Sequence, residues 1–128
     1  MVVTGYDLGM NTSGGFSECI RVPSDWVVKL PETISLKYAM AIGTAGLTAA
    51  LCIDLLSKNS KIKKRHAVVT GSTGGVGSIA IQLLSKLGAE ITAVTGKNES
   101  ADFLSSLGAN TILSRKELFD QFRQPLSK

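Results

Sequence analysis

The chain has 128 residues, a formal net charge of +4, 44% hydrophobic residues and 13 glycines. This length allows one modest domain with its own core, and the apolar content argues against a disordered chain. Much of the basic charge falls in one run, Lys58 to Arg65, which contains no aromatic residue, so nucleic-acid binding is not expected. Cys19 and Cys52 stand far apart without metal-ligand spacing, and no leader is apparent, so we expect a reduced, cytoplasmic, metal-free chain.

Residues 1–34 predict β structure separated by turns. Residues 16–22 alternate apolar and polar side chains with period two, and residues 26–30 form a second short apolar run. Pro23-Ser24-Asp25 marks a turn between the two predicted strands. Two or three strands cannot bury their own faces, so this region is expected to be the end of a larger domain.

Residues 35–65 predict connecting helices and a linker. Ser35 is a candidate N-cap for a helix over residues 35–57, and Gly43 predicts a kink near residues 42–44. The uncharged run over residues 39–53 is too short to span a membrane, so no membrane segment is expected. Residues 58–65 are polar and predict a linker.

Residues 66–128 predict an alternation of strands and helices. Strands are expected over residues 66–70, 90–95 and 110–113, and helices over 76–87, 101–107 and from 116 onward. The first of these helices is expected to bury Val76, Ile79, Ala80, Leu83, Leu84 and Leu87. Gly88 and Gly108 end two helices, and Asn98 or Ser100 caps the second. The order β-α-β-α-β predicts an α/β fold, the first half of a doubly wound parallel sheet.

The glycine-rich turn after the strand at 66–70 predicts a dinucleotide site. Gly71, Gly74, Gly75 and Gly77 allow the backbone to approach a pyrophosphate, and the following helix directs its N-terminal N–H groups there. A tight turn without any ligand is the alternative. The strand before the turn and the helix after it favour the cofactor.

Thr95-Gly96-Lys97 follows the next strand, where an acidic residue would favour NAD. A hydroxyl, a backbone N–H and an ammonium group instead suit the 2′-phosphate of NADPH, and Arg115 follows the third strand and could reach the same pocket. Ordinary surface charge is the alternative for Lys97 and Arg115. The sequence shows no catalytic nucleophile or acid–base pair, and His66, Tyr6 and Tyr38 are best explained as structural residues.

A second group of small residues lies at Ile42-Gly43-Thr44-Ala45-Gly46. Small side chains could let this helix pack beside a bound nicotinamide, and Thr44 offers a hydroxyl, although a close helix crossing explains the same spacing. Together with Gly14-Gly15-Phe16-Ser17-Glu18 and the turn at 70–78, this block resembles the medium-chain dehydrogenase/reductase superfamily. The resemblance is to the zinc-independent quinone oxidoreductase branch, and most to the acrylyl-CoA reductase group.

This resemblance implies a GroES-like substrate domain, of which residues 1–34 are the last strands, then connecting helices at 35–65. It also implies a Rossmann domain that binds NADPH, of which 66–128 would be the first half. The matching cofactor positions are Thr73, Gly74, Gly75 and Val76 for the pyrophosphate and Thr95, Gly96, Lys97 and Arg115 for the 2′-phosphate. Thr44 lies in the block that approaches the nicotinamide in relatives.

The resemblance further implies a homodimer that transfers hydride from NADPH to an activated C=C bond, as in acrylyl-CoA and other enoyl compounds, or to a quinone, without zinc. Segments that complete both domains in the family lie outside this sequence, so an inactive nucleotide-binding segment is an open alternative. A short-chain dehydrogenase is a further alternative, because Thr70-Gly71 and Gly75 fit its turn. That alternative is disfavoured, because the first Rossmann strand comes late and no Tyr-x-x-x-Lys is present.

Overall fold

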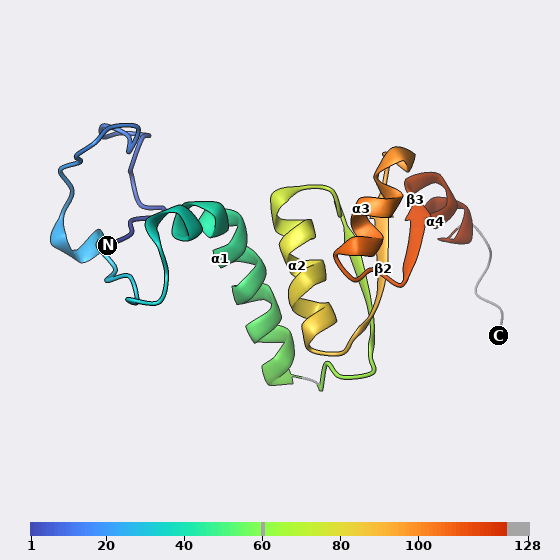
Figure 1. Cartoon of the computed structure of the whole chain (residues 1–128). Coiled ribbons are helices and arrows are strands. Elements are labelled where there is room, and N and C mark those ends of the chain that lie inside the picture. The colour runs from blue at the N-terminus through green and yellow to red at the C-terminus, as the bar shows by residue number, and fades with distance from the viewer. Residues whose placement is uncertain (60, 123–128) are drawn as a thin grey trace. The chain divides into compact units, whose positions relative to one another are not determined.

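The computed structural model describes residues 1–59 and 61–122, and the chain divides into two compact units, residues 1–44 and 45–128. The predicted domain limits at residues 34, 65 and 128 stay a prediction, and residues 60 and 123–128 within them lie outside the described residues. In chain order the elements are η1 Ser24–Trp26, α1 Leu36–Asn59, β1 His66–Thr70, α2 Gly75–Lys86, β2 Glu90–Thr95, η2 Asn98–Ser100, α3 Ala101–Ser106, β3 Thr111–Ser114 and α4 Arg115–Phe122 (Figure 1).

The first unit consists mainly of turns, and the strands predicted over residues 16–22 and 26–30 are wrong. Its only strand-like pairing in the described residues is an antiparallel bridge in which Val2 and Val28 exchange hydrogen bonds of 2.8 and 2.9 Å. Period-two alternation gives a strand one apolar face and one polar face. A strand also needs a neighbouring strand that bonds its backbone N–H and C=O groups. In the described residues, 16–22 have no such neighbour.

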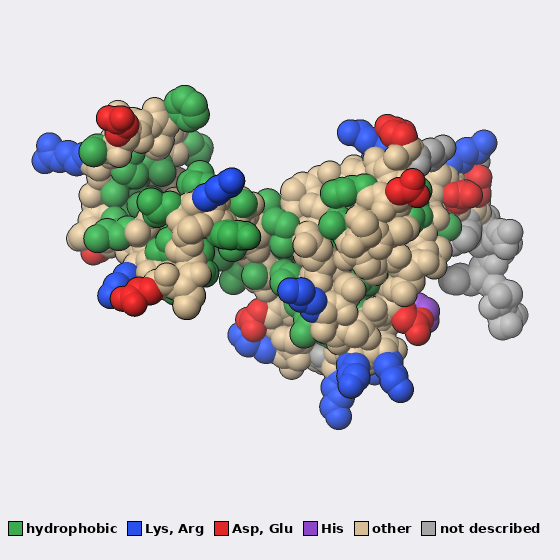
Figure 2. All heavy atoms as spheres, viewed as in Figure 1, with side chains coloured by type: hydrophobic (Ala, Val, Ile, Leu, Met, Phe, Trp, Pro, Cys, Tyr) green, Lys and Arg blue, Asp and Glu red, His purple; other side chains and the backbone are tan. Residues whose placement is uncertain are grey.

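Apolar side chains remain exposed across the first unit. Phe16, Met10, Met40 and Tyr38 all present most of their surface to solvent, and Figure 2 shows hydrophobic side chains gathered over the N-terminal part of the chain. One local cluster is ordered by aromatic stacking, because the rings of Tyr6 and Trp26 lie parallel with centroids 5.0 Å apart. This cluster is consistent with the expected packing role of Tyr6.

Helix α1 begins and bends where the sequence predicts. Ser35 caps it, since its Oγ accepts the Tyr38 N–H at 3.2 Å, as expected for a serine at an N-cap. Gly43 has φ 49° and ψ −159°, which interrupts the helical backbone at the predicted kink. Glycine can adopt this conformation at low cost because it has no Cβ.

By length and composition alone, α1 is long and apolar enough to cross a membrane. The uncharged run at residues 39–53, from which no membrane segment was expected, is only part of this helix. The Gly43 interruption leaves residues 45–59 as the longer helical segment, fewer than the roughly 20 residues needed to span a hydrocarbon core. Within the second unit this segment also contributes Gly46, Ala49 and Ile53 to buried positions. Most of its larger apolar side chains remain exposed in this structure, namely Leu47, Leu51, Leu55 and Leu56, so burial explains only part of its apolar character.

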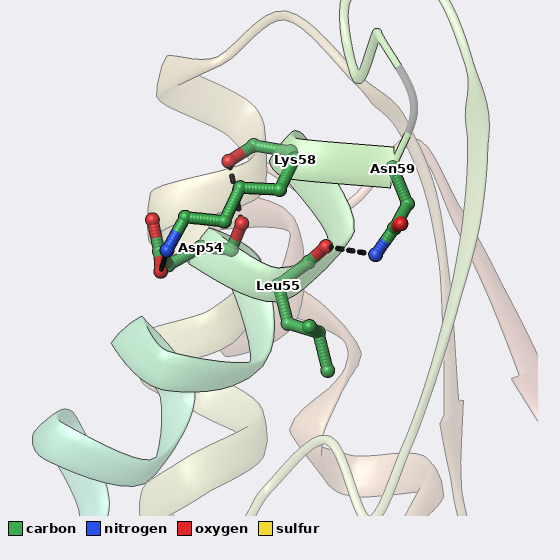
Figure 3. Close-up of polar contacts among 5 residues, drawn as sticks. Asp54, Leu55, Lys58 and Asn59 are labelled. Atoms are coloured by element: carbon green, nitrogen blue, oxygen red, sulfur yellow. Dashed lines mark hydrogen bonds and ion pairs between the residues drawn. The ribbon is translucent and has the colours of Figure 1, made fainter.

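The C-terminal end of α1 is closed by its own side chains, as Figure 3 shows. Lys58 Nζ pairs with Asp54 Oδ2 at 2.6 Å, and Asn59 Nδ2 donates to the Leu55 carbonyl oxygen at 2.8 Å. Lys58 is thus a helix-terminal cation, where the helix dipole favours positive charge. Lys58, the first residue of the basic run at 58–65, therefore has a structural role at the end of α1.

The second unit contains a three-stranded parallel sheet in the order β1-β2-β3 (Figure 1). His66 pairs with Glu90 and Thr70 with Val94, while Thr92 pairs with Thr111 and Thr95 with Ser114. The predicted strands and the α/β alternation are confirmed, with the third strand shifted by one residue. β2 lies between the other two strands, so it carries the most buried side chains of the sheet.

The core is centred on Ile81, Ile91, Ala93 and Leu104, which are nearly or completely inaccessible to solvent. The prediction for α2 is partly wrong here. Val76 and Leu87 remain 40% and 45% exposed, whereas Ile81, outside the predicted face, is fully buried. α2 is apolar over more than one face, so the packing of its neighbours, rather than its periodicity, selects which residues become core.

Candidate functional site

The carboxyl ends of the three parallel strands bring the predicted site residues to one edge of the sheet. β1 ends at Thr70, β2 at Thr95 and β3 at Ser114, and the register holds these ends side by side. Each strand is followed at once by a turn or a helix that contains predicted cofactor residues. In open α/β sheets, this edge is where ligands bind.

The glycine-rich turn after β1 is packed too closely for side chains at its critical positions. Gly71 has φ 61°, in the left-handed region that favours glycine. A Cβ atom at Gly77 would meet the Gly71 carbonyl oxygen and lie 2.9 Å from the Ser72 Cα. The turn is further closed by a bond of 2.9 Å from the Gly74 N–H to the Gly71 oxygen.

Ser72, which is not among the site residues predicted from the sequence, anchors this turn to the neighbouring strand. It is fully buried, and its Oγ lies 2.7 Å from the Val69 oxygen and 3.0 Å from the Val94 oxygen. The glycine turn is thus tied to the end of β2. A serine inside a turn often bonds nearby backbone groups, so its position was a signal for this role.

The N-terminus of α2 is open toward the site. Its N-cap, Gly74, makes no side-chain capping bond, so the first-turn N–H groups of Gly75 and Val76 are available to an external acceptor. A Cβ at Gly75 would lie 3.1 Å from the Cβ of Ala45, so α1 closes tightly behind this turn. These features fit a phosphate group, which is stabilised by free N–H groups and the positive end of a helix.

The end of β2 carries a second part of the site. Thr95 is buried, and its Oγ1 accepts the Lys97 N–H at 3.0 Å, so it shapes the turn through Gly96. A Cβ at Gly96 would lie 3.7 Å from Nη2 and 3.8 Å from Cζ of Arg115. The fold therefore places the Arg115 guanidinium against Gly96, although the two residues are far apart in the sequence.

The charges at this position are not neutralised from within the described part of the chain. Neither Lys97 nor Arg115 forms an ion pair there. The nearest acidic side chain along α4, Glu117, instead accepts the Ser114 N–H at 2.7 Å. Hydrogen bonding with the Ser114 backbone, and secondly with the Ser114 side chain, holds the pKa of the Glu117 carboxyl below its usual value. Two cations thus remain available to an anion.

The comparisons with known proteins agree with this architecture. No family model matches the chain. A Bacillus subtilis protein named as a quinone oxidoreductase, YhfP, is 46% identical over all of this chain and 39% of its own length. The acrylyl-CoA reductase AcuI of Ruegeria pomeroyi is 44% identical over 98% of this chain and 38% of its own length.

Two solved structures are similar over the same region. The yhdH oxidoreductase of Salmonella enterica, in complex with NADP, has a TM-score of 0.84 and 49% identity over 90% of this chain. Bacillus subtilis yhfP, with NAD bound, has a TM-score of 0.87 and 48% identity over 98% of this chain. This chain covers 36% and 39% of those two chains.

The chain is homologous to part of the medium-chain dehydrogenases/reductases. The relatives named above are a quinone oxidoreductase and an acrylyl-CoA reductase, as the resemblance in the sequence implies, so the short-chain dehydrogenase alternative is not supported. The chain spans about 39% of the length of the curated relatives it matches.

Within this medium-chain reductase segment, the site residues predicted from the sequence divide into two groups. Those on the second unit meet at one sheet edge, as described above. Thr44 belongs to the first unit, where its Oγ1 lies 3.0 Å from the Oγ1 of Thr4, and its contact with a nicotinamide stays a prediction. His66 pairs with Glu90 across β1 and β2 at 2.9 Å, in agreement with a structural role.

Proposed function

We propose that this chain carries the NADPH-binding half of a reductase that transfers hydride to an activated C=C bond or to a quinone. The observation that supports it most directly is the Arg115 guanidinium held against Gly96 at the carboxyl end of β2. The open N-terminus of α2 lies at the same edge of the sheet. The named substrates of AcuI and YhfP supply the substrate class.

The α2 turn would hold the pyrophosphate of the cofactor. Gly74 and Gly75 leave room for an approaching phosphate, and the N–H groups of Gly75 and Val76 would donate to its oxygens. Thr73 lies in the same turn and is partly buried, and its hydroxyl would donate to the phosphate from the rim of this cradle. No charged side chain is required here, because the helix dipole and the backbone donors act together.

The β2 turn would hold the adenosine 2′-phosphate. Arg115 offers a planar set of donors suited to a phosphate, and Lys97, the residue after Gly96, would add a point charge. Thr95 would act indirectly by orienting the Lys97 backbone. Both cations are exposed and lack acidic partners in the described residues, so a doubly charged phosphate would be favoured over the neutral hydroxyl of NADH.

When bound, NADPH would supply the hydride that reduces the substrate. The chain's own residues would bind and orient the cofactor, and no acid or base is assigned among them. Homodimer formation and a cytoplasmic location remain predictions from the family resemblance. Zinc independence also stays a prediction, although no three candidate metal ligands gather among the residues that the structure describes.

Titration of the chain with NADPH and, separately, with NADH tests this function. We expect NADPH to bind more tightly, and Arg115→Ala to weaken NADPH binding by about tenfold or more through loss of a charge-assisted hydrogen bond. Binding of NADH should change little, because it lacks the 2′-phosphate. The measurement is the dissociation constant of each nucleotide by calorimetry, supported by the shift in melting temperature.

Lys116→Ala is the matched control, because it removes an equal charge from the next position of α4. It should affect NADPH binding less than Arg115→Ala. Equal binding of NADPH and NADH by the unsubstituted chain, or no binding of either, would contradict the proposal. NADPH binding without oxidation by a quinone or an unsaturated acyl-CoA would favour the alternative of an inactive nucleotide-binding segment.

A further inference from the structure

The first turn of α4 is closed by a reciprocal pair of hydrogen bonds. The Ser114 Oγ accepts the Glu117 N–H at 3.1 Å, and the Glu117 Oε2 accepts the Ser114 N–H at 2.7 Å. This is a capping box, in which the N-cap residue and the third helical residue satisfy each other's backbone donors. The box joins the last residue of β3 to the first turn of α4.

Arg115 is the first helical residue inside this box. The backbone of Arg115 is held between Ser114, the last residue of β3, and Glu117, because these two residues bond each other. The capping box therefore fixes the direction in which the Arg115 side chain leaves the backbone. The guanidinium then lies against Gly96, at the end of the adjacent strand β2. An opened first turn would allow Arg115 to move away from that position, because helix ends without caps fray.

The charges in the first turn of α4 indicate that Glu117 does more than cap the helix. Arg115 and Lys116 stand in the first turn of a helix, where the dipole disfavours positive charge. Glu117 is the one acidic residue of that turn and offsets the two cations. Its carboxylate bonds the Ser114 N–H rather than the Arg115 guanidinium, so it holds the turn while leaving the arginine to an anion.

We infer that Glu117 is a positioning residue for recognition of the 2′-phosphate of NADPH, acting through the capping box to hold Arg115 beside Gly96. This inference rests on the proposed function. It assigns a selectivity role to a carboxylate that carries the same sign of charge as the phosphate. Plain electrostatics predicts the opposite effect, since removal of a negative charge near a phosphate would strengthen binding.

The test compares the dissociation constants of NADPH and NADH for the whole chain and its variants. Glu117→Ala should weaken NADPH binding by about three- to tenfold and leave NADH binding unchanged, because a helix cap is lost. Glu117→Gln should retain most of the affinity, because glutamine also serves in a capping box. In the Arg115→Ala background, Glu117→Ala should have no further effect on NADPH binding.

Asp120→Ala is the matched control, since it removes the same charge from the same helix without touching the box. It should not weaken NADPH binding. Ser114→Ala removes the reciprocal acceptor and should reproduce the NADPH-selective loss, which keeps the test valid if Glu117→Ala fails to fold.

Each outcome separates the two proposals. Unchanged NADPH binding by Glu117→Ala, or equal losses for NADPH and NADH, would overturn the role of Glu117. If Arg115→Ala itself left the preference for NADPH unchanged, the proposed function would fail instead. A selective loss with Arg115→Ala but none with Glu117→Ala or Ser114→Ala would retain the proposed function and remove only this inference.

Discussion

Gly77 illustrates how strongly single positions constrain the nucleotide turn. The position is helical and buried, where alanine would normally be preferred to glycine. The requirement comes instead from the turn that the helix faces, because a Cβ at this position would collide with the backbone of Gly71 and Ser72. Backbone atoms of a closed turn cannot move aside as a flexible side chain can.

We therefore expect Gly77→Ala to lower the free energy of unfolding by about 1–3 kcal/mol, the usual cost of overpacking. Gly96→Ala is the matched control, since its Cβ would find the Arg115 side chain at an ordinary distance of 3.7 Å. That substitution should change stability by less than about 0.5 kcal/mol. Urea denaturation measures both, and equal stability of the two variants would contradict the assignment of a backbone clash.

At the scale of elements, α2 and α3 end in the same way. After α2, the N–H groups of Gly88 and Ala89 bond the Ser85 and Leu84 carbonyls at 2.9 and 3.1 Å. After α3, Gly108 and Ala109 repeat the pattern at 3.0 and 3.1 Å. Both glycines have positive φ, as the Schellman motif requires, which confirms the helix ends predicted from the sequence.

The two glycines differ in what surrounds them, so their substitution should differ in cost. Gly88→Ala should lower the free energy of unfolding by about 1 kcal/mol, from its positive φ alone. Gly108→Ala should cost more, because its Cβ would also collide with the Ser85 side chain. A double-mutant cycle with Ser85→Gly measures the excess as a coupling of at least about 0.5 kcal/mol, and additive effects would refute the contact.

At the scale of the whole chain, the two units differ in how their backbones are satisfied. The second unit joins three strands in a continuous ladder and buries a core around Ile81 and Leu104. In the first unit, no backbone N–H of residues 13–22 bonds another backbone group of the described chain. Local stability follows such bonding and burial, so it should differ between the units.

Hydrogen exchange of the chain by mass spectrometry should show this difference directly. Amides in residues 91–95 should exchange slowly, because β2 is paired on both sides. Amides in residues 13–22 should exchange close to the rate of an unstructured peptide. Strong protection of residues 13–22 would show that they form pairings absent from the structure.

Local patterns in the sequence predicted most of the second unit. The strand at 66–70, the turn at 71–74, the glycine helix ends and the kink at Gly43 each depend on neighbouring residues only, so each could be read from the sequence. The strands expected in residues 16–30 failed for the complementary reason. A strand is completed by a partner that may lie anywhere in the chain, and alternation does not identify one.

In the candidate site too, local features could be predicted from the sequence, whereas contacts between distant residues could not. The sequence alone determined a glycine-rich turn before a helix and cations after two later strands, because those residue types and spacings are local. Only the tertiary structure brought Arg115 against Gly96, buried Ser72 between two strand ends and made Ile81 the centre of the core. Each of these outcomes depends on which elements pack together, a matter of sheet register and helix packing over long separations in the chain.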